Sequence, residues 1–248
     1  MPATTDLKYW PERRDLAAAF RWAERFSMHE AVANHFSLAV GTDGHQFLIN
    51  PNQMHFRRIR ASDLLLLDAN EPETMHRANA PDPTAWGLHS ALHRLVPHAR
   101  CIMHLHPIFS TVLASLADSR LPAIDQNTAA FYNRIVIDTG FSGLAFEQEG
   151  ERCARLFTHP KIKVMIMGNH GILVIGNSVA DTFNRLYYFE RAAETYIRAL
   201  QTGQKLRVLS HQIAETTAQQ LENYPGQAEA HFSELKTILD DEDSNYAL

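Results

Sequence analysis

The chain has 248 residues, of which 45% are hydrophobic and 21% charged, and a formal net charge of −5. This is ordinary globular usage, and it argues against a nucleic-acid partner, because phosphate binding requires clustered Lys and Arg. No apolar run approaches the roughly 20 residues that span a bilayer, so no membrane partner is expected. No repeat or linker divides the sequence, which predicts a single domain over residues 1–248.

Cysteine usage bears on the compartment. Cys101 and Cys153 each lie in an apolar stretch and offer no disulfide framework, and the first ten residues lack the pattern of a signal peptide. A cytoplasmic protein is therefore expected. Histidine is the unusual residue, with 14 copies in a chain that is not otherwise biased.

Predicted strands and helices alternate along the chain. In order, they are a helix over 12–28, strands over 36–40 and 46–50 joined by a turn at 42–44, a strand over 62–68, a helix over 83–95, a strand over 100–104, a helix over 107–117, strands over 134–138, 163–167 and 172–175, and a helix over 179–200. Asp82 and Ser178 are predicted to cap helices. Residues 201–248 are expected to form a polar helical extension whose last residues, 240–248, fray. Hairpins among the alternating elements predict a mixed sheet covered by helices.

Two histidines, His104 and His106, are separated by one residue and followed by Pro107. On a strand, side chains at i and i+2 point to the same face, so both imidazoles can reach one ion. Proline ends the predicted strand here and places the pair at a strand edge beside a helix start. A third histidine, His170, also follows a predicted strand, and the adjacent Gly171 allows backbone and ligand to approach closely.

Three neutral imidazoles with open coordination positions suit Zn²⁺, Mn²⁺, Co²⁺ or Fe²⁺ in a catalytic site. A structural zinc site would require a fourth ligand, usually Cys, and neither cysteine is placed for it. The hypothesis is one divalent ion per chain, first of all zinc, held by His104, His106 and His170. The alternative on spacing alone is that these are surface or core histidines that share a face.

Five motifs follow one another along the chain: Asn34-His35-Phe36-Ser37, Phe47-Leu48-Ile49-Asn50-Pro51, Ala61-Ser62-Asp63-Leu64, residues 97–107 with His-Leu-His, and residues 168–176 with Asn-His-Gly. Together they resemble the class II aldolase and adducin head-domain family, over about residues 12–200. The resemblance implies a three-layer α/β/α fold with a mixed central sheet and a homotetramer with sites at subunit interfaces. It also implies a catalytic zinc or manganese ion held by His104, His106 and His170.

The chain departs from the sugar-phosphate aldolases of this family at three positions. Those enzymes carry an acid/base Glu where this chain has Ala85, and phosphate-binding hydroxyls where it has Pro83 and Val32. Recognition of phosphate needs several donors that converge on one anion. Turnover of a phosphorylated sugar by the family's usual route is therefore not expected.

The favoured hypothesis for function is a metal-dependent carbon–carbon lyase, either a decarboxylase or an aldol-type lyase, acting on a small unphosphorylated oxo- or hydroxy-acid. The metal would stabilise the enolate left when the carbon bond breaks. Two alternatives stay open: a non-catalytic adducin-like interaction module, and a sugar-phosphate aldolase or epimerase of the same family. A module that only binds partners has no need for three ligands in register.

Candidates for the acid/base that Ala85 cannot supply are His35, Tyr132 and His89. The imidazole of His35 titrates near neutrality, and Tyr132 ends a polar-then-aromatic stretch between a helix and a strand. His89 has His93 at i+4 on a helix, which could mimic a pair of metal ligands. A structural role is nevertheless favoured for His89. The predicted catalytic residues are thus His35 and Tyr132.

A homo-oligomer, in particular a tetramer, is expected mainly from the resemblance. The run Leu186–Phe189 supports it, because consecutive apolar and aromatic residues on the predicted helix over 179–200 would expose apolar groups on more than one face.

Overall fold

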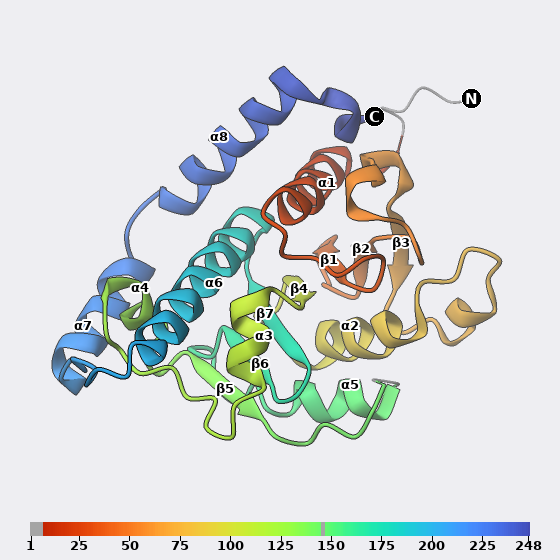
Figure 1. Ribbon diagram of the computed structural model, residues 1–248. Coiled ribbons are helices and arrows are strands. Elements are labelled where there is room, and N and C mark those ends of the chain that lie inside the picture. Colours follow the sequence, from red (N-terminus) through yellow and green to blue (C-terminus); the bar gives the residue numbers. More distant parts are fainter. Residues whose placement is uncertain (1–6, 145–146) are drawn as a thin grey trace.

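A seven-stranded sheet forms the centre of the computed structural model, which describes residues 7–144 and 147–248 (Figure 1). The strand order is β3-β2-β1-β4-β7-β6-β5, and among the described strands only β5 and β6 pair in parallel. The sheet is therefore mixed, as predicted. Its strands are β1 (His35–Val40), β2 (Gln46–Ile49), β3 (Leu65–Asp68), β4 (Cys101–Leu105), β5 (Ile135–Asp138), β6 (Val164–Met167) and β7 (Gly171–Gly176).

Helices cover both faces of the sheet, which gives the three layers of an α/β/α sandwich (Figure 1). One face carries α1 (Trp10–Arg25), α3 (Ile108–Ala114), α6 (Val179–Gln201) and α8 (Gln227–Glu242), and the other carries α2 (Pro83–Leu95) and α5 (Glu147–Ala154). The shorter α4 (Gln126–Ala129) contacts α6 and α7 (His211–Glu222). Short 3-10 helices lie at Phe56–Arg58, Ala61–Asp63, Pro72–His76 and Ser244–Ala247. Among the described residues, no helix combines the length and the hydrophobicity needed to cross a membrane.

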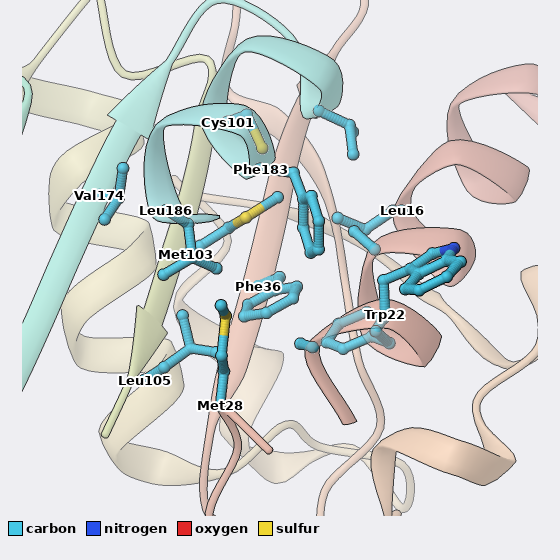
Figure 2. Close-up of a cluster of buried hydrophobic side chains, with 14 of the residues drawn as sticks. Leu16, Trp22, Met28, Phe36, Cys101, Met103, Leu105, Val174, Phe183 and Leu186 are labelled. Atoms are coloured by element: carbon cyan, nitrogen blue, oxygen red, sulfur yellow. The ribbon is translucent and has the colours of Figure 1, made fainter. Parts of the chain in front are cut away.

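Strand alternation divides β4 between two environments. Cys101, Met103 and Leu105 are buried in the core cluster that includes residues of α1 and α6, as Figure 2 shows. Ile102 belongs to the separate cluster on the α2 and α5 face, and His104 shares its face because side chains alternate along a strand. The apolar half of the strand anchors it in the core and presents His104 to the opposite layer.

The neighbouring strand β1 alternates in the same way. Phe36 joins the α1 and α6 cluster (Figure 2). Its ring stacks on that of Phe20 with centroids 4.6 Å apart. His35 and Ser37 therefore face α2, and the antiparallel pairing sets His35 directly opposite His104. Two strands thus deliver polar side chains to one buried layer.

Several predicted boundaries differ from the observed ones for local reasons. The helix predicted over 12–28 ends at Arg25, because Ser27 takes a left-handed φ of 54°. The strand predicted over 62–68 begins only at Leu65, because the Asp63 carboxylate accepts a hydrogen bond from the Arg60 backbone N–H at 2.9 Å and closes a 3-10 turn. The helix predicted over 83–95 is confirmed with its Asp82 cap.

Helix α5 has no counterpart among the predicted elements. It packs closely on α2, and a Cβ atom at Gly150 would overlap with the backbone carbonyl of Gly87. The helix has only 8 residues and is rich in Glu. A helix this short is marginal by itself, so its packing on α2 contributes more to its stability than its own helix propensity does.

The expectation that residues 240–248 fray was wrong. Tyr246 is fully buried, and its hydroxyl donates to the Asp240 carboxylate at 2.7 Å. The Ser62 backbone N–H donates to the Leu248 carbonyl at 2.9 Å. The last residues pack on α1 because one large aromatic side chain fills the space beside that helix.

Replacing this aromatic tests the anchor. Tyr246→Ala is expected to lower the free energy of unfolding by about 3–5 kcal/mol, the usual cost of emptying a large aromatic site. Tyr224→Ala is the control, since Tyr224 is 65% exposed, and it should change the value by less than about 0.5 kcal/mol. Urea denaturation followed by circular dichroism measures both; equal stability of the two variants would show that the C-terminal residues do not anchor the fold.

Candidate active site

His104, His106 and His170 converge beside one another at the end of β4. His104 lies in β4, His106 follows that strand, and His170 lies in the turn between β6 and β7. The three ring centroids are 4.7, 4.8 and 5.0 Å apart, and one nitrogen of each ring lies within 4.8 Å of the others. The fold therefore brings together the three residues that were predicted as ligands, in an arrangement that could hold one metal ion.

The other nitrogens of two of these rings have fixed partners. The Nδ1 of His104 donates to the Ile172 carbonyl at 3.0 Å, and the Nδ1 of His106 donates to the Glu30 carboxylate. A neutral imidazole has one N–H, so in its neutral form each ring keeps Nε2 free to accept or to bind a metal. Burial lowers the pKa of His104 well below its usual value and keeps that ring neutral.

The two Nε2 atoms face each other at 3.2 Å. Two lone pairs cannot hydrogen-bond, so a cation between them would relieve their repulsion. Metal–nitrogen bonds of about 2.0–2.1 Å at a tetrahedral angle place two ligand nitrogens about 3.3 Å apart. The spacing of His104 and His106 therefore fits a divalent ion, with His170 as the third donor.

The turn that presents His170 is built from backbone contacts. Asn169 takes a left-handed φ of 57°, and its N–H donates to the Ala114 carbonyl at 2.9 Å. Gly171, the first residue of β7, directly follows His170. A Cβ at Gly171 would overlap with the ring of His106 and lie 2.6 Å from the Leu105 carbonyl oxygen. Glycine is needed there because the His106 ring occupies the space that a side chain would fill.

His35 lies against the three histidines, with its ring centroid 4.9 Å from that of His104. Behind it, on the α2 side, its Nδ1 is 2.8 Å from the Nε2 of His89. The Nδ1 of His89 is 2.5 Å from the Ser37 hydroxyl, which is also 2.8 Å from the Nε2 of His93. Burial lowers the pKa of His35 and of His93 to about 3, and that of His89 well below its usual value. The three rings are therefore neutral near pH 7, and His89 and His93 share Ser37 and not an ion.

Tyr132, the other predicted catalytic residue, does not meet the three histidines within one chain. It packs with Ala123, Ala129 and Leu209, and its hydroxyl is 2.9 Å from the Nδ1 of His211. Tyr132 packs toward the segment that leads into α7, and therefore away from the three histidines.

Position 85 lies one helical turn before His89 on α2. Ala85 is buried against the apolar side chains of Phe47, Ile49 and Leu67, and it offers no acid/base group. Glu30, the partner of His106, was not predicted from the sequence. The two residues are 76 positions apart in the chain. No local pattern signals such a pairing.

Two other features of the described residues are separate from this site. Asp138, Glu149 and Cys153 also lie within reach of a common point, but Arg152 donates to both carboxylates, at 2.6 Å to Asp138, and occupies the position of a cation. A cavity of about 670 Å³ beside the start of α6 is lined by charged residues such as Arg185, and it contains none of the three histidines.

Comparison with known proteins agrees with this fold. Residues 14–197 match the family model described as the Class II Aldolase and Adducin N-terminal domain. A Pseudomonas aeruginosa protein, named as an aldolase class 2 protein, is 29% identical over 205 residues, which cover 82% of this chain and 77% of that protein. The chain belongs to the class II aldolase and adducin family.

Solved structures agree on the architecture. An aldolase II superfamily protein from Pseudomonas syringae superposes with a TM-score of 0.86 at 26% identity, covering 98% of both chains. The L-fuculose 1-phosphate aldolase from Glaciozyma antarctica gives a TM-score of 0.80 at 20% identity, covering 98% of this chain and 94% of that one, and shows the likeness of the fold alone.

The glycine beside the histidines can be tested directly. Gly171→Ala should displace the His106 ring and lower the affinity for added Zn²⁺ or Co²⁺ by about 10- to 100-fold, as losses in ligand orientation commonly do. Gly203→Ala is the control for a glycine replaced away from the site: its φ of 66° strains the backbone there, but a Cβ meets nothing within 4 Å, so the metal affinity should not change. Isothermal titration measures both affinities, and an unchanged value for Gly171→Ala would contradict this account of the turn.

Proposed function

We propose that this protein is a divalent-metal-dependent carbon–carbon lyase, a decarboxylase or an aldol-type lyase, acting on a small unphosphorylated oxo- or hydroxy-acid. The observation that carries the proposal is the pair of Nε2 atoms of His104 and His106, 3.2 Å apart, with His170 beside them. Their partners, the Ile172 carbonyl and the Glu30 carboxylate, support it, because ligand histidines commonly donate their second nitrogen to a fixed acceptor. Zinc is the first expectation, with manganese, cobalt and iron as alternatives.

A divalent ion bound there would supply a Lewis acid that polarises a substrate carbonyl and stabilises negative charge on its oxygen. His104, His106 and His170 are three donors, so a catalytic geometry keeps positions for the substrate. His35, neutral and beside His104, takes up or returns the proton of the reacting carbon. Tyr132 has no part in this proposal for a single chain, since its hydroxyl meets His211.

An unphosphorylated substrate is supported by what surrounds the site. Ala85 is enclosed by apolar side chains, Pro83 offers no backbone N–H, and Val32 exposes an aliphatic side chain where a hydroxyl would be needed. The family includes adducins, so an interaction module is the competing function. The oriented tautomers of His104 and His106 favour the enzyme, because a surface used only for docking gains nothing from them.

We also propose that the protein is a cytoplasmic homo-oligomer, most simply a tetramer. The run Leu186–Phe189 does not support this, because Leu186 and Phe189 are buried within the chain. The support comes from α3, which begins two residues after His106 and exposes Ile108 and Val112 at helical spacing, with Leu116 also exposed just after its end. The two buried free cysteines are compatible with a reducing compartment.

Metal content tests the site itself. Protein purified without chelator should contain about one Zn, Mn, Co or Fe per chain, and His104→Ala or His170→Ala should empty the site, since two imidazoles do not close the coordination shell. His76→Ala is the control, because that side chain is exposed and pairs only with Glu73 among its described neighbours. Elemental analysis decides; full occupancy in a protein that lacks both His104 and His106 would overturn the ligand assignment.

A substrate panel tests the reaction. Metal-loaded protein should release CO₂ or an aldehyde from an unphosphorylated oxo- or hydroxy-acid, and His35→Gln should slow that release by about 10²- to 10⁴-fold. Fuculose, rhamnulose and ribulose phosphates should give negligible turnover. Ala85→Glu should not create such activity, and its buried carboxylate should destabilise the fold. Robust turnover of a sugar phosphate by the wild-type protein would replace the present proposal with the sugar-phosphate alternative.

Sedimentation tests the oligomer. Val112→Asp combined with Ile108→Asp should dissociate the assembly at micromolar concentration, because each charge would be buried in an apolar contact. Ile238→Asp, on α8, is the control, since that residue is similarly exposed but lies on another helix, and it should leave the assembly intact. A wild-type protein that sediments only as a monomer would contradict the proposal.

A further inference from the structure

A row of buried side chains leads from the interior of α2 to the candidate site. It runs from His93 through Ser37 and His89 to His35, and each neighbouring pair is within hydrogen-bonding distance. Each neutral imidazole has one donor and one acceptor nitrogen, and each hydroxyl has one donor. The hydroxyl also has two acceptor lone pairs, so the hydrogen bonds run in one direction along the row whenever Ser37 donates to one of its two neighbouring rings. If the ring of His93 accepts a hydrogen bond from Ser37, the tautomers of His89 and then of His35 follow.

The inner end sets that direction. The backbone carbonyl of Ala99 is the hydrogen-bonding neighbour that acts to raise the pKa of the His93 ring against the effect of burial, and a carbonyl can only accept. Since the Nε2 of His93 faces Ser37, its Nδ1 carries the proton and its Nε2 accepts from the hydroxyl. The Ser37 oxygen then accepts from the Nδ1 of His89, and the Nε2 of His89 accepts from the Nδ1 of His35.

The outer end is consistent with the same direction. With its proton on Nδ1, His35 keeps a lone pair on Nε2, which points away from His89. Among residues 7–144 and 147–248, no group hydrogen-bonds this Nε2, and it is not among the enclosed side-chain atoms that lack a partner. A lone pair there suits the vicinity of a cation held by His104 and its neighbours, whereas an N–H would be repelled.

We propose that His93, Ser37 and His89 are positioning residues that hold His35 in the Nδ1–H tautomer and so present Nε2 as the proton acceptor of the site. The purpose of this arrangement rests on the proposed function, in which His35 takes up the proton of the substrate. The tautomer itself does not, because it follows from the hydrogen bonds alone. A merely structural network would hold α2 on the sheet equally well in either direction.

Nitrogen-15 spectroscopy of the full-length protein reads the tautomer without substrate. In histidine-labelled protein, with zinc and after chelation, the His35 signals are assigned by their loss in His35→Gln. Long-range correlation spectra should show Nδ1 protonated and Nε2 unprotonated in one population. Ser37→Ala separates His89 from the Ala99 carbonyl and should convert this into a mixture of both tautomers. A protonated Nε2 in the wild type, or an unchanged spectrum in Ser37→Ala, would overturn the relay.

A neighbouring serine provides the matched control. Ser90 is fully buried on α2, next to His89, and its hydroxyl has no partner among the described residues. Ser90→Ala should keep the single tautomer; a mixture there as well would assign the effect to general repacking and overturn the relay.

A second variant covers the case in which Ser37→Ala does not fold. His93→Phe keeps the ring stacked on Phe47, whose centroid is 4.6 Å away, and removes the link to Ala99. It should give the same mixture of tautomers, and an unchanged single tautomer would again overturn the relay. Because the readout needs neither turnover nor metal, absence of lyase activity would leave the relay standing.

Discussion

The antiparallel register of β1 and β4 is the constraint on which the rest of the site depends. It sets His35 opposite His104 and Ser37 opposite Ile102, on the face that α2 covers. The same register sends Phe36 and Met103 to the opposite face, into the main core (Figure 2). A slip of one residue would exchange the two faces, burying imidazoles among aromatic rings. The hydrophobic effect therefore holds the polar layer in place, because the apolar side of each strand fits only one face.

A buried polar layer is stable only when its members satisfy one another. His35, Ser37, His89 and His93 do so in a single row, and His104 uses the Ile172 carbonyl of the adjacent strand β7. Neutral imidazoles suit this role, since each can accept on one side and donate on the other without carrying charge into the interior. The same property makes unprotonated nitrogens available at the surface of the layer, where the candidate ligands lie.

The third histidine reaches the site by a different physical route. His170 comes from a turn and not from a strand face, and its position depends on backbone hydrogen bonds to Met167 and, through Asn169, to Ala114. Gly171 then leaves room for the ring of His106. The group of three therefore joins one strand, its following residue and a distant turn. Glu30, from the segment after α1, completes it by orienting His106.

The sequence by itself determined the features that depend on neighbouring residues. The His-x-His pair at a strand end, the Asp82 cap of α2 and the alternation of β4 follow from local spacing and capping chemistry. The family motifs likewise pointed to His170 as the third member of the group.

Contacts between distant segments were decided only by the tertiary structure. Helix α5 exists through its close approach to α2 at Gly150, Tyr246 is buried because α1 leaves space for it, and Tyr132 packs toward α7 and not toward the histidines. Glu30 meets His106 across 76 residues. No periodicity encodes such pairings, because which side chains meet depends on how the helices and strands pack, and the site is complete only where they do.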